Sequence, residues 1–237
     1  MPQQKFITPD CRTCLSRNAS LFGCCGEQEL DQVNAVKQCQ VYKKGQLIFQ
    51  EGNRPAGLHV IYSGKVKVTK LGGDGKEQII RLARPGDVVG YRALIAETNY
   101  SASAVALDDC TVCMIPKQDF QHMIQQNIQI SNGLMKLLST TLGNAESRML
   151  QLAYKPVRER LAEALLLLQS TYEPQNSPEP FSIAISREDL ASIVGTVKET
   201  CIRLLAELKD EGIICTKGSH ITLLEPEKLY EITHLYD

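Results

Sequence analysis

The segment from Ser186 to Ile214 has the pattern of two short helices joined by a tight turn. Ser186 precedes Asp189 by three residues, which is the spacing of a capping box at a helix start. Gly195 lies at the expected turn, where glycine adopts a positive φ at no steric cost. In the second helix, apolar residues recur at helical spacing and form one stripe. They are Val197, Cys201, Leu204, Leu205 and Leu208. The pattern is typical of a helix-turn-helix, and equally of two helices in a helical core.

A strand–turn–strand pattern follows the two helices. It covers 212–224, with its turn at Lys217-Gly218-Ser219, and a further short strand is expected over 181–185. Such a hairpin is a wing, and a winged helix-turn-helix favours DNA binding over a chance pair of core helices. We expect Thr196 to cap the second helix, whose early outward side chains would then reach the bases. The predicted DNA contacts are Arg187, Thr196, Lys198, Glu199, Ile202, Arg203 and, in the wing, Lys217.

The length of 237 residues suits two domains that each bury a core. A net charge of -1 gives no general attraction for nucleic acid, so DNA binding must depend on a local patch. No apolar run reaches the length of a transmembrane helix, and the polar first residues do not form a signal peptide. The protein is therefore expected in the cytoplasm.

Residues 41–116 are punctuated by glycines, with short apolar or alternating runs between them. The strands are expected over 58–62, 65–71, 78–82 and 110–115, with turns at Gly72-Gly73-Asp74-Gly75 and Pro85-Gly86-Asp87. Many short strands at even spacing predict a small barrel or jelly roll.

A long helical pattern covers 119–153, where apolar residues repeat at threes and fours. Such a helix is longer than a small domain needs, so its apolar face is expected to pair with a second copy of the chain. The alternative is a helix that lies across its own barrel. Lys155-Pro156 marks a hinge before another helix over 158–168, and the polar loop 173–180 follows.

This order of elements resembles the cyclic-AMP receptor protein and fumarate-nitrate regulator (CRP/FNR) family. Its most specific motifs are Lys44-Gly45 with Glu51-Gly52, Tyr62-Ser63-Gly64, Pro85-Gly86-Asp87 with Gly90, and Val197-Lys198-Glu199-Thr200 with Arg203-Leu204-Leu205. The resemblance implies an α+β protein in four parts. They are a cysteine-rich N-terminal arm (1–28), a β-roll sensor domain like a cyclic-nucleotide-binding jelly roll (29–116), a dimerisation helix (117–153) and a winged helix-turn-helix DNA-binding domain (154–237).

The resemblance also implies a homodimeric transcription regulator that binds palindromic double-stranded DNA and works with RNA polymerase. Glu199 and Arg203 match the family's base-reading glutamate and arginine. Arginine can donate to guanine O6 and N7, and glutamate can accept from cytosine N4. Lys198 falls where the cyclic-AMP receptor has another arginine, and Ile202 falls where the family carries a small residue.

The effector is not cyclic AMP by the same comparison. In the cyclic-AMP branch, a glutamate after the glycine of the roll holds the ribose, and an arginine before a serine holds the phosphate. Those places are Tyr91 and Tyr100 here, so the charge-assisted contacts to ribose and phosphate are lost. Arg92 is a nearby cation displaced by one residue. With Ser101, these three residues mark the expected effector pocket.

The nine cysteines are an odd number, which argues against a closed disulfide framework. The oxygen-sensing branch of the family binds an iron–sulfur cluster through cysteines, and thiolates suit that metal. Cys11, Cys14 and Cys113 fall at matching places. The place of the third N-terminal ligand is Ser20, so Cys24 or Cys25 would have to substitute.

Two other interpretations of the cysteines stay open. The pairs Cys11/Cys14 and Cys110/Cys113 would suit zinc or a reversible thiol switch. Alternatively, the cysteines are inert, and the regulator responds to another small molecule or is constitutive.

Enzyme functions fit the sequence less well than a regulator does. A cupin-type metal enzyme needs clustered histidines, but the four in this chain are scattered. They are His59, His122, His220 and His234. A thioredoxin-like oxidoreductase needs its C-x-x-C in a βαβ unit, and Cys11 precedes none. We therefore expect no enzyme activity.

Overall fold

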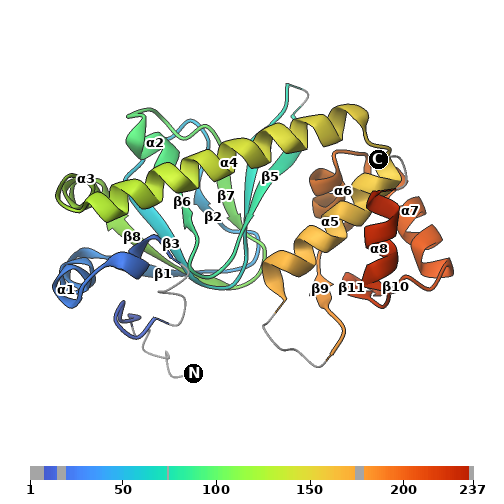
Figure 1. Ribbon diagram of the computed structural model, residues 1–237, viewed down its shortest axis with the longest axis horizontal. Helices are drawn as coiled ribbons and strands as arrows, with labels where there is room; N and C mark the ends of the chain where they lie inside the picture. Colours follow the sequence, from blue (N-terminus) through green and yellow to red (C-terminus); the bar gives the residue numbers. More distant parts are fainter. Residues whose placement is uncertain (1–7, 15–19, 74, 174–178, 235–237) are drawn as a thin grey trace. The chain divides into compact units, whose positions relative to one another are not determined.

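The computed structural model describes residues 8–14, 20–73, 75–173 and 179–234 (Figure 1). The chain divides into two compact units, of which one comprises Met1–Lys70 and Arg81–Thr140, and the other Leu71–Ile80 and Thr141–Asp237. Asp74, in the first predicted turn, and 174–178 of the predicted loop lie outside the described residues. Within the described chain, no helix is both long enough and apolar enough to cross a membrane.

Two antiparallel four-stranded sheets form the β-roll. One has the order β1-β8-β3-β6, with bounds β1 (Gln38–Tyr42), β8 (Cys110–Pro116), β3 (Gly57–Ser63) and β6 (Val88–Val89). The other has the order β2-β7-β4-β5, with bounds β2 (Leu47–Phe49), β7 (Ser103–Ala106), β4 (Val66–Leu71) and β5 (Glu77–Ala83). All four predicted strands of this region are present within one residue at each end, so the jelly-roll prediction is confirmed.

The two sheets pack face to face around a core that includes Ile61, Val66, Val89 and Val112. At the end of β3, Gly64 lies close against the start of β8 in the same sheet, with a φ of +85°. A Cβ atom there would lie 2.5 Å from Cys110 Cβ and 2.6 Å from Asp109 O, so a larger residue would push the backbone apart. This contact accounts for the glycine in the Tyr62-Ser63-Gly64 motif.

Helices cover the outer face of the β1-β8-β3-β6 sheet. They are α1 (Glu27–Val36), α2 (Tyr91–Ile95), α3 (Lys117–Gln126) and the start of α4 (Ile128–Tyr154), with the short 3-10 helix η2 (Leu21–Cys24) before α1. Leu30, Leu58, Ile115 and Phe120 are fully buried in the cluster that joins these elements. A second hydrophobic core, independent of the one between the sheets, therefore holds the N-terminal helices on the roll.

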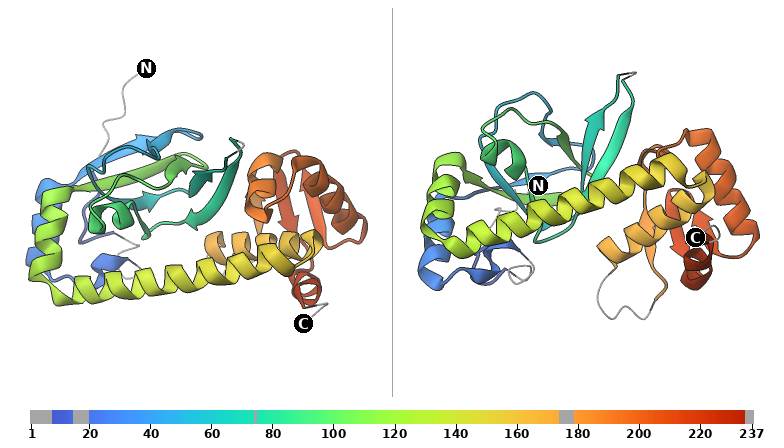
Figure 2. Two further views of the ribbon diagram at one scale, coloured as in Figure 1. Left: turned by 90° about the horizontal axis from the view of Figure 1, so that it is seen from above. Right: turned by 45° about the horizontal axis from the view of Figure 1, so that its top comes forward.

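The predicted continuous helix over 119–153 is wrong at one position. Asn127 ends α3 with extended backbone, and its Oδ1 accepts from the N–H groups of Gln129 at 2.8 Å and Ile130 at 3.2 Å. This side chain therefore caps α4 as a new helix, a competition with the helical backbone that is typical of asparagine. The resulting bend between α3 and α4 is plain in both views of Figure 2.

The second unit holds the predicted winged helix. Its sheet has the order β10-β11-β9, with bounds β10 (Ile214–Lys217), β11 (His220–Leu223) and β9 (Ser182–Ala184). Its helices after α4 are α5 (Val157–Tyr172), α6 (Arg187–Val194), α7 (Lys198–Asp210) and α8 (Pro226–Thr233). Leu161, Leu190, Cys201 and Leu208 are fully buried. The α+β architecture expected from the sequence is therefore confirmed.

Candidate functional site

The helix-turn-helix is formed by α6 and α7. Ser186 caps α6, since its Oγ accepts from the backbone N–H of Asp189 at 2.9 Å. Gly195 ends the helix in the left-handed conformation, with φ +72° and ψ 48°. In the next helix Cys201, Leu204, Leu205 and Leu208 are buried as predicted. The capped start and the glycine turn thus fix which face of α7 points outward.

The N-terminus of α7 differs from the prediction. The N-cap residue is Val197 rather than Thr196, and no side chain bonds the free N–H groups there. Val197 is 52% exposed, so it is not part of the buried stripe. Thr196 is half-buried in the turn. Unbonded N–H groups and the positive end of the helix dipole are left at this terminus, and both favour an anion such as a phosphate.

The outward face of α7 carries the predicted base-contacting side chains. Lys198, Glu199, Ile202 and Arg203 are all exposed. The Lys198 ammonium pairs with the Glu188 carboxylate of α6, which raises the pKa of Lys198 and lowers that of Glu188. The Arg203 guanidinium pairs with Glu207 Oε1 at 2.6 Å. Exposed ion pairs of this kind contribute little to stability, so Lys198 and Arg203 can exchange their glutamate partners for acceptor atoms of DNA at a small cost in free energy.

The wing lies against the start of α6. Arg187 Nη2 donates to the Gly218 carbonyl at 3.1 Å, so this predicted DNA contact also links α6 to the turn of the wing. Lys217 is exposed at the end of β10, opposite His220. Its side chain is therefore available to a phosphate beside the groove that α7 would enter.

Aromatic side chains occupy the roll near the expected effector pocket. Tyr91 and Tyr100 are buried, and the Tyr100 ring stacks on Phe49 with a centroid distance of 4.1 Å. His59 lies 5.3 Å from the same Phe49 ring. Burial raises the pKa of Tyr100 to about 12 and lowers that of His59 to about 4, so both are neutral near pH 7.

The two other expected effector residues lie at the surface. Arg92 and Ser101 are exposed, and Arg92 Nη2 donates to Ser101 Oγ at 2.5 Å. The predicted set therefore divides into two buried tyrosines and an exposed arginine–serine pair. Neither buried tyrosine can supply the charge that a ribose phosphate needs.

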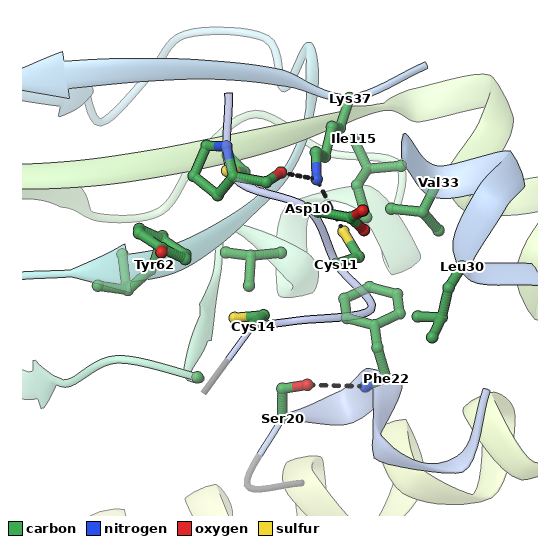
Figure 3. Close-up of a pocket in the computed structure, with 15 residues that line it drawn as sticks. Asp10, Cys11, Cys14, Ser20, Phe22, Leu30, Val33, Lys37, Tyr62 and Ile115 are labelled. Carbon is green, nitrogen blue, oxygen red and sulfur yellow. Dashed lines mark hydrogen bonds between the residues drawn. The ribbon is translucent and has the colours of Figure 1, made fainter. Parts of the chain in front are cut away.

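Three of the predicted cluster ligands line one cavity in the first unit. They are Cys11, Cys14 and Cys113. Figure 3 shows Cys11 and Cys14 in this cavity beside Phe22 and Lys37. Lys37 is buried, and its ammonium donates to Cys11 Sγ at 3.0 Å and to Asn34 Oδ1 at 2.6 Å. The N-terminal arm is thus held on α1 by a buried cation that contacts a cysteine.

The ligand set does not fit a cluster in the form that the structure describes. Cys113 is joined to Cys39 by a disulfide, so its sulfur is not available as a thiolate. Cys24 is exposed and donates to the Leu21 carbonyl, whereas Cys25 is buried in the helix-covered core. Over the described parts of the chain, no group of three histidine, cysteine or acidic residues is placed to hold a metal ion.

The second C-x-x-C pair is divided by the geometry of β8. Residues three apart in a strand point to opposite faces of the sheet. Cys110 therefore lies in the core between the sheets, where burial raises its pKa to about 11, while Cys113 faces the cavity. The predicted pairing of these two cysteines on one zinc ion or in one thiol switch is wrong for this reason.

Comparison with known proteins identifies both units. The model of the cyclic nucleotide-binding domain matches residues 39–127, and that of the Crp-like helix-turn-helix domain matches 159–232. The chain belongs to the CRP/FNR family. It is 29% identical to the fumarate and nitrate reduction regulatory protein of Vibrio cholerae, over 94% of this chain and 89% of that one. It is also 29% identical to the transcriptional activator protein anr of Pseudomonas aeruginosa, over 84% of this chain and 81% of that one.

A solved CRP/FNR family transcriptional regulator from Thermus thermophilus has the same fold. It is 26% identical, with a TM-score of 0.71 over 83% of this chain and 98% of that one. The present chain is therefore a DNA-binding transcription regulator of the CRP/FNR type, and the expectation that it is not an enzyme is confirmed by the nature of its relatives.

Sequence reasoning missed three residues that the structure places beside the expected effector pocket or the cavity of Cys11 and Cys14. Phe49 stacks on Tyr100, Lys37 contacts Cys11, and Cys39 bonds to Cys113. None of the three carried a sequence signal, and the strand β1 that holds Cys39 was itself not predicted. The pairing itself depends on strand register, which the sequence does not state.

Proposed function

We propose that the regulator acts as a homodimer that binds a two-fold-symmetric DNA site through paired α7 helices. The observation that carries this proposal is the outward face of α7, where exposed Glu199 and Arg203 stand beside a wing with an exposed Lys217. In a helix-turn-helix dimer, two such helices enter successive major grooves one helical turn apart. The same residues then read both halves of a palindrome.

The helix α4 supplies the surface for pairing. Ile128, Met135, Leu142 and Met149 follow one another at intervals of seven residues, and they are exposed by 70%, 57%, 62% and 69%. A heptad repeat of apolar residues is the pattern by which two helices pack along a common seam. Exposed apolar surface of this extent is costly in water, so a second copy of α4 is the occupant that we propose.

The activity is proposed to be set by a signal in the first unit and not by cyclic AMP. The buried Tyr91 and Tyr100, which stand where the cyclic-AMP branch has a glutamate and an arginine, support the exclusion of the nucleotide, and the cavity lined by Cys11, Cys14 and Cys113 supports a signal at the cysteines. Binding of an iron–sulfur cluster is part of this proposal only for a form in which Cys113 is a thiol. The alternative is a metal-free regulator that responds to another small molecule.

Two further parts of the proposal rest on family membership. CRP/FNR regulators act at promoters, so contact with RNA polymerase and a cytoplasmic location are proposed for this one.

Selection of bound duplexes from a random pool, followed by titration of the selected site, tests the function. The protein is purified under nitrogen, assayed for iron, sulfide and zinc, and titrated before and after exposure to air. We expect a palindromic site, one dimer per site, and an affinity that differs between the two conditions. Binding of a non-palindromic site by a monomer would contradict the dimer, and equal affinity before and after air would contradict a signal at the cysteines.

A further inference from the structure

The disulfide between Cys39 and Cys113 joins two residues that lie directly opposite each other on neighbouring strands of one sheet. Cys39 lies on β1 and Cys113 on β8, and the antiparallel register pairs them directly, with a Cα–Cα distance of 3.9 Å. Neighbouring pairs of the ladder run on both sides, from Gln38↔Met114 to Tyr42↔Cys110. The backbone pairing of the two strands therefore keeps the two sulfur atoms opposed whether or not they are bonded.

The two cysteines differ in their access to solvent. Cys39 is partly exposed on β1, which is the edge strand of its sheet, whereas Cys113 is buried between β1 and β3. A small oxidant in solution therefore meets Cys39 first. Cys113 is placed to react second, because it lies directly opposite.

Closure of the bond changes what Cys113 can do. Its sulfur lines the cavity that Cys11 and Cys14 also line, and only a thiolate can act there as a ligand or nucleophile. When Cys113 is bonded to Cys39, that sulfur is withdrawn from both roles. When the bond is reduced, a third thiol is returned to the cavity.

We propose that Cys39 and Cys113 form a reversible redox switch, closed by a hydroperoxide and opened by a dithiol, which withdraws Cys113 from the cavity of Cys11 and Cys14. The proposal deepens the proposed signal at the cysteines, and its regulatory meaning rests on that function. The proposal gives a role to Cys39, which belongs to neither C-x-x-C motif of the sequence.

The chemistry balances with hydrogen peroxide as the oxidant. The Cys39 thiolate attacks one peroxide oxygen, the O–O bond breaks, and Cys39 becomes a sulfenic acid while hydroxide leaves and is protonated to water. The Cys113 sulfur then attacks the Cys39 sulfur, and the second hydroxide leaves as water with the proton of Cys113. Two thiols are oxidised to one disulfide as one peroxide is reduced to two waters. A dithiol returns two electrons and two protons by exchange.

Peptide mass mapping of the full-length protein tests the switch. The protein is reduced with dithiothreitol under nitrogen, freed of it, treated with one equivalent of hydrogen peroxide and alkylated with iodoacetamide. We expect a cross-linked peptide between Cys39 and Cys113, loss of alkylation at Cys113, and full recovery of alkylation when dithiothreitol is added to the native protein. A bond that native protein does not release to dithiothreitol, or a Cys113 that stays alkylated after peroxide, would overturn the proposal.

Two variants and a control assign the roles. In Cys39→Ser, peroxide should leave Cys113 open to alkylation, and in Cys113→Ser, dimedone should trap a sulfenic acid at Cys39. Cys215→Ser removes an exposed thiol on β10 and should leave the cross-link unchanged. Trapping of sulfenic acid at Cys113 in Cys39→Ser, but not at Cys39 in Cys113→Ser, would contradict the order of attack.

DNA titration of the same samples separates this proposal from the function above. If the reduced protein binds a specific DNA site but forms no Cys39–Cys113 bond after peroxide treatment, the switch is overturned and the DNA-binding proposal stays intact. A reversible bond in protein that binds no specific site would uphold the switch and remove the DNA-binding proposal.

Discussion

Arg203 is the side chain on α7 from which we expect base recognition. It is exposed, and its only described ion-pair partner is Glu207, one turn further along the helix. Substitution by alanine removes a donor fork suited to guanine, so Arg203→Ala should weaken specific binding by about 1–3 kcal/mol and relax preference at one base pair in each half-site. Fluorescence anisotropy with the selected site and with a scrambled duplex measures this effect. An equal loss on both duplexes would show that Arg203 does not read a base.

His59 is a buried base whose neutral form the fold favours. Its pKa is about 4 in the folded chain because of burial, against an ordinary value of 6.5. Between these values the unfolded chain binds the proton more strongly, so stability is full above about pH 6.5 and is lost as the pH falls toward 4, by up to about 3 kcal/mol. Urea unfolding at several pH values measures this loss. The variant His59→Gln should flatten the dependence in this window, and an unchanged profile would contradict the assignment.

At the residue scale, the sequence predicted the buried face of helix α7 better than it predicted the residue that caps its N-terminus. The apolar repeat predicted from Val197 to Leu208 gave the buried side of α7 at four of its five positions, with Val197 exposed instead, since helical periodicity is a property of neighbours in the chain. It did not predict that Val197 rather than Thr196 would begin the helix. The choice of N-cap depends on how the turn after Gly195 packs, which is a tertiary property.

The wing is the element that we expect to contact DNA without reading it. Lys217 lies at the end of β10, where its ammonium can neutralise a phosphate. Lys217→Ala should therefore weaken binding to all duplexes alike and reduce the slope of log affinity against log salt by about one. Titration at several salt concentrations measures the slope. If that slope is unchanged, Lys217 makes no phosphate contact.

The pairing of β1 with β8 closes a long loop of the chain through Cys39 and Cys113, which are 74 residues apart in sequence. A disulfide across such a loop restricts the unfolded chain, so Cys39→Ser should lower the free energy of unfolding by about 2–4 kcal/mol relative to the oxidised protein. Urea denaturation measures the difference. In dithiothreitol the variant and the wild-type chain should converge, and a gap that persists there would point to lost packing instead.

Four strands of the roll were predictable, because glycine or proline punctuates the chain around them and the run from Lys65 to Leu71 alternates with a period of two, whereas β1, β2, β6 and β7 were not predicted. The partners of the strands were not predictable, because register and strand order are set by contacts between residues far apart in sequence. The Cys39–Cys113 pair follows from that register, whereas the opposite orientations of Cys110 and Cys113 follow from the alternation of side chains along β8. The interruption at Asn127 was also missed, since a single capping side chain overrode an otherwise continuous apolar repeat.

For the whole molecule, the order of roll, long helix and winged helix was evident from the sequence, because glycine-punctuated strand patterns give way to helical periodicity along the chain. Leu142 lies within the exposed heptad of α4, so Leu142→Glu should place like charges in the seam and convert the proposed dimer to a monomer. Sedimentation equilibrium measures the change.

The matched control for that prediction is Asn144→Glu, which adds the same charge at an exposed position of α4 outside the heptad. It should leave the sedimentation behaviour as it is in the wild-type protein. If both variants stay dimeric, the seam is not formed by this stripe, and loss of dimer in both would indicate a general effect of charge on α4.

The two faces of β8 also bear on how related regulators are recognised. Written in sequence, Cys110 and Cys113 look like one motif, yet one lies in the interior of the roll and the other in the cavity beside the N-terminal arm. A survey that selects chains by this C-x-x-C would therefore select for a spacing in sequence that does not bring the two sulfur atoms to a common site. The informative signature is the distant one, a cysteine in the first strand of the roll that is aligned by register with a cysteine in the last.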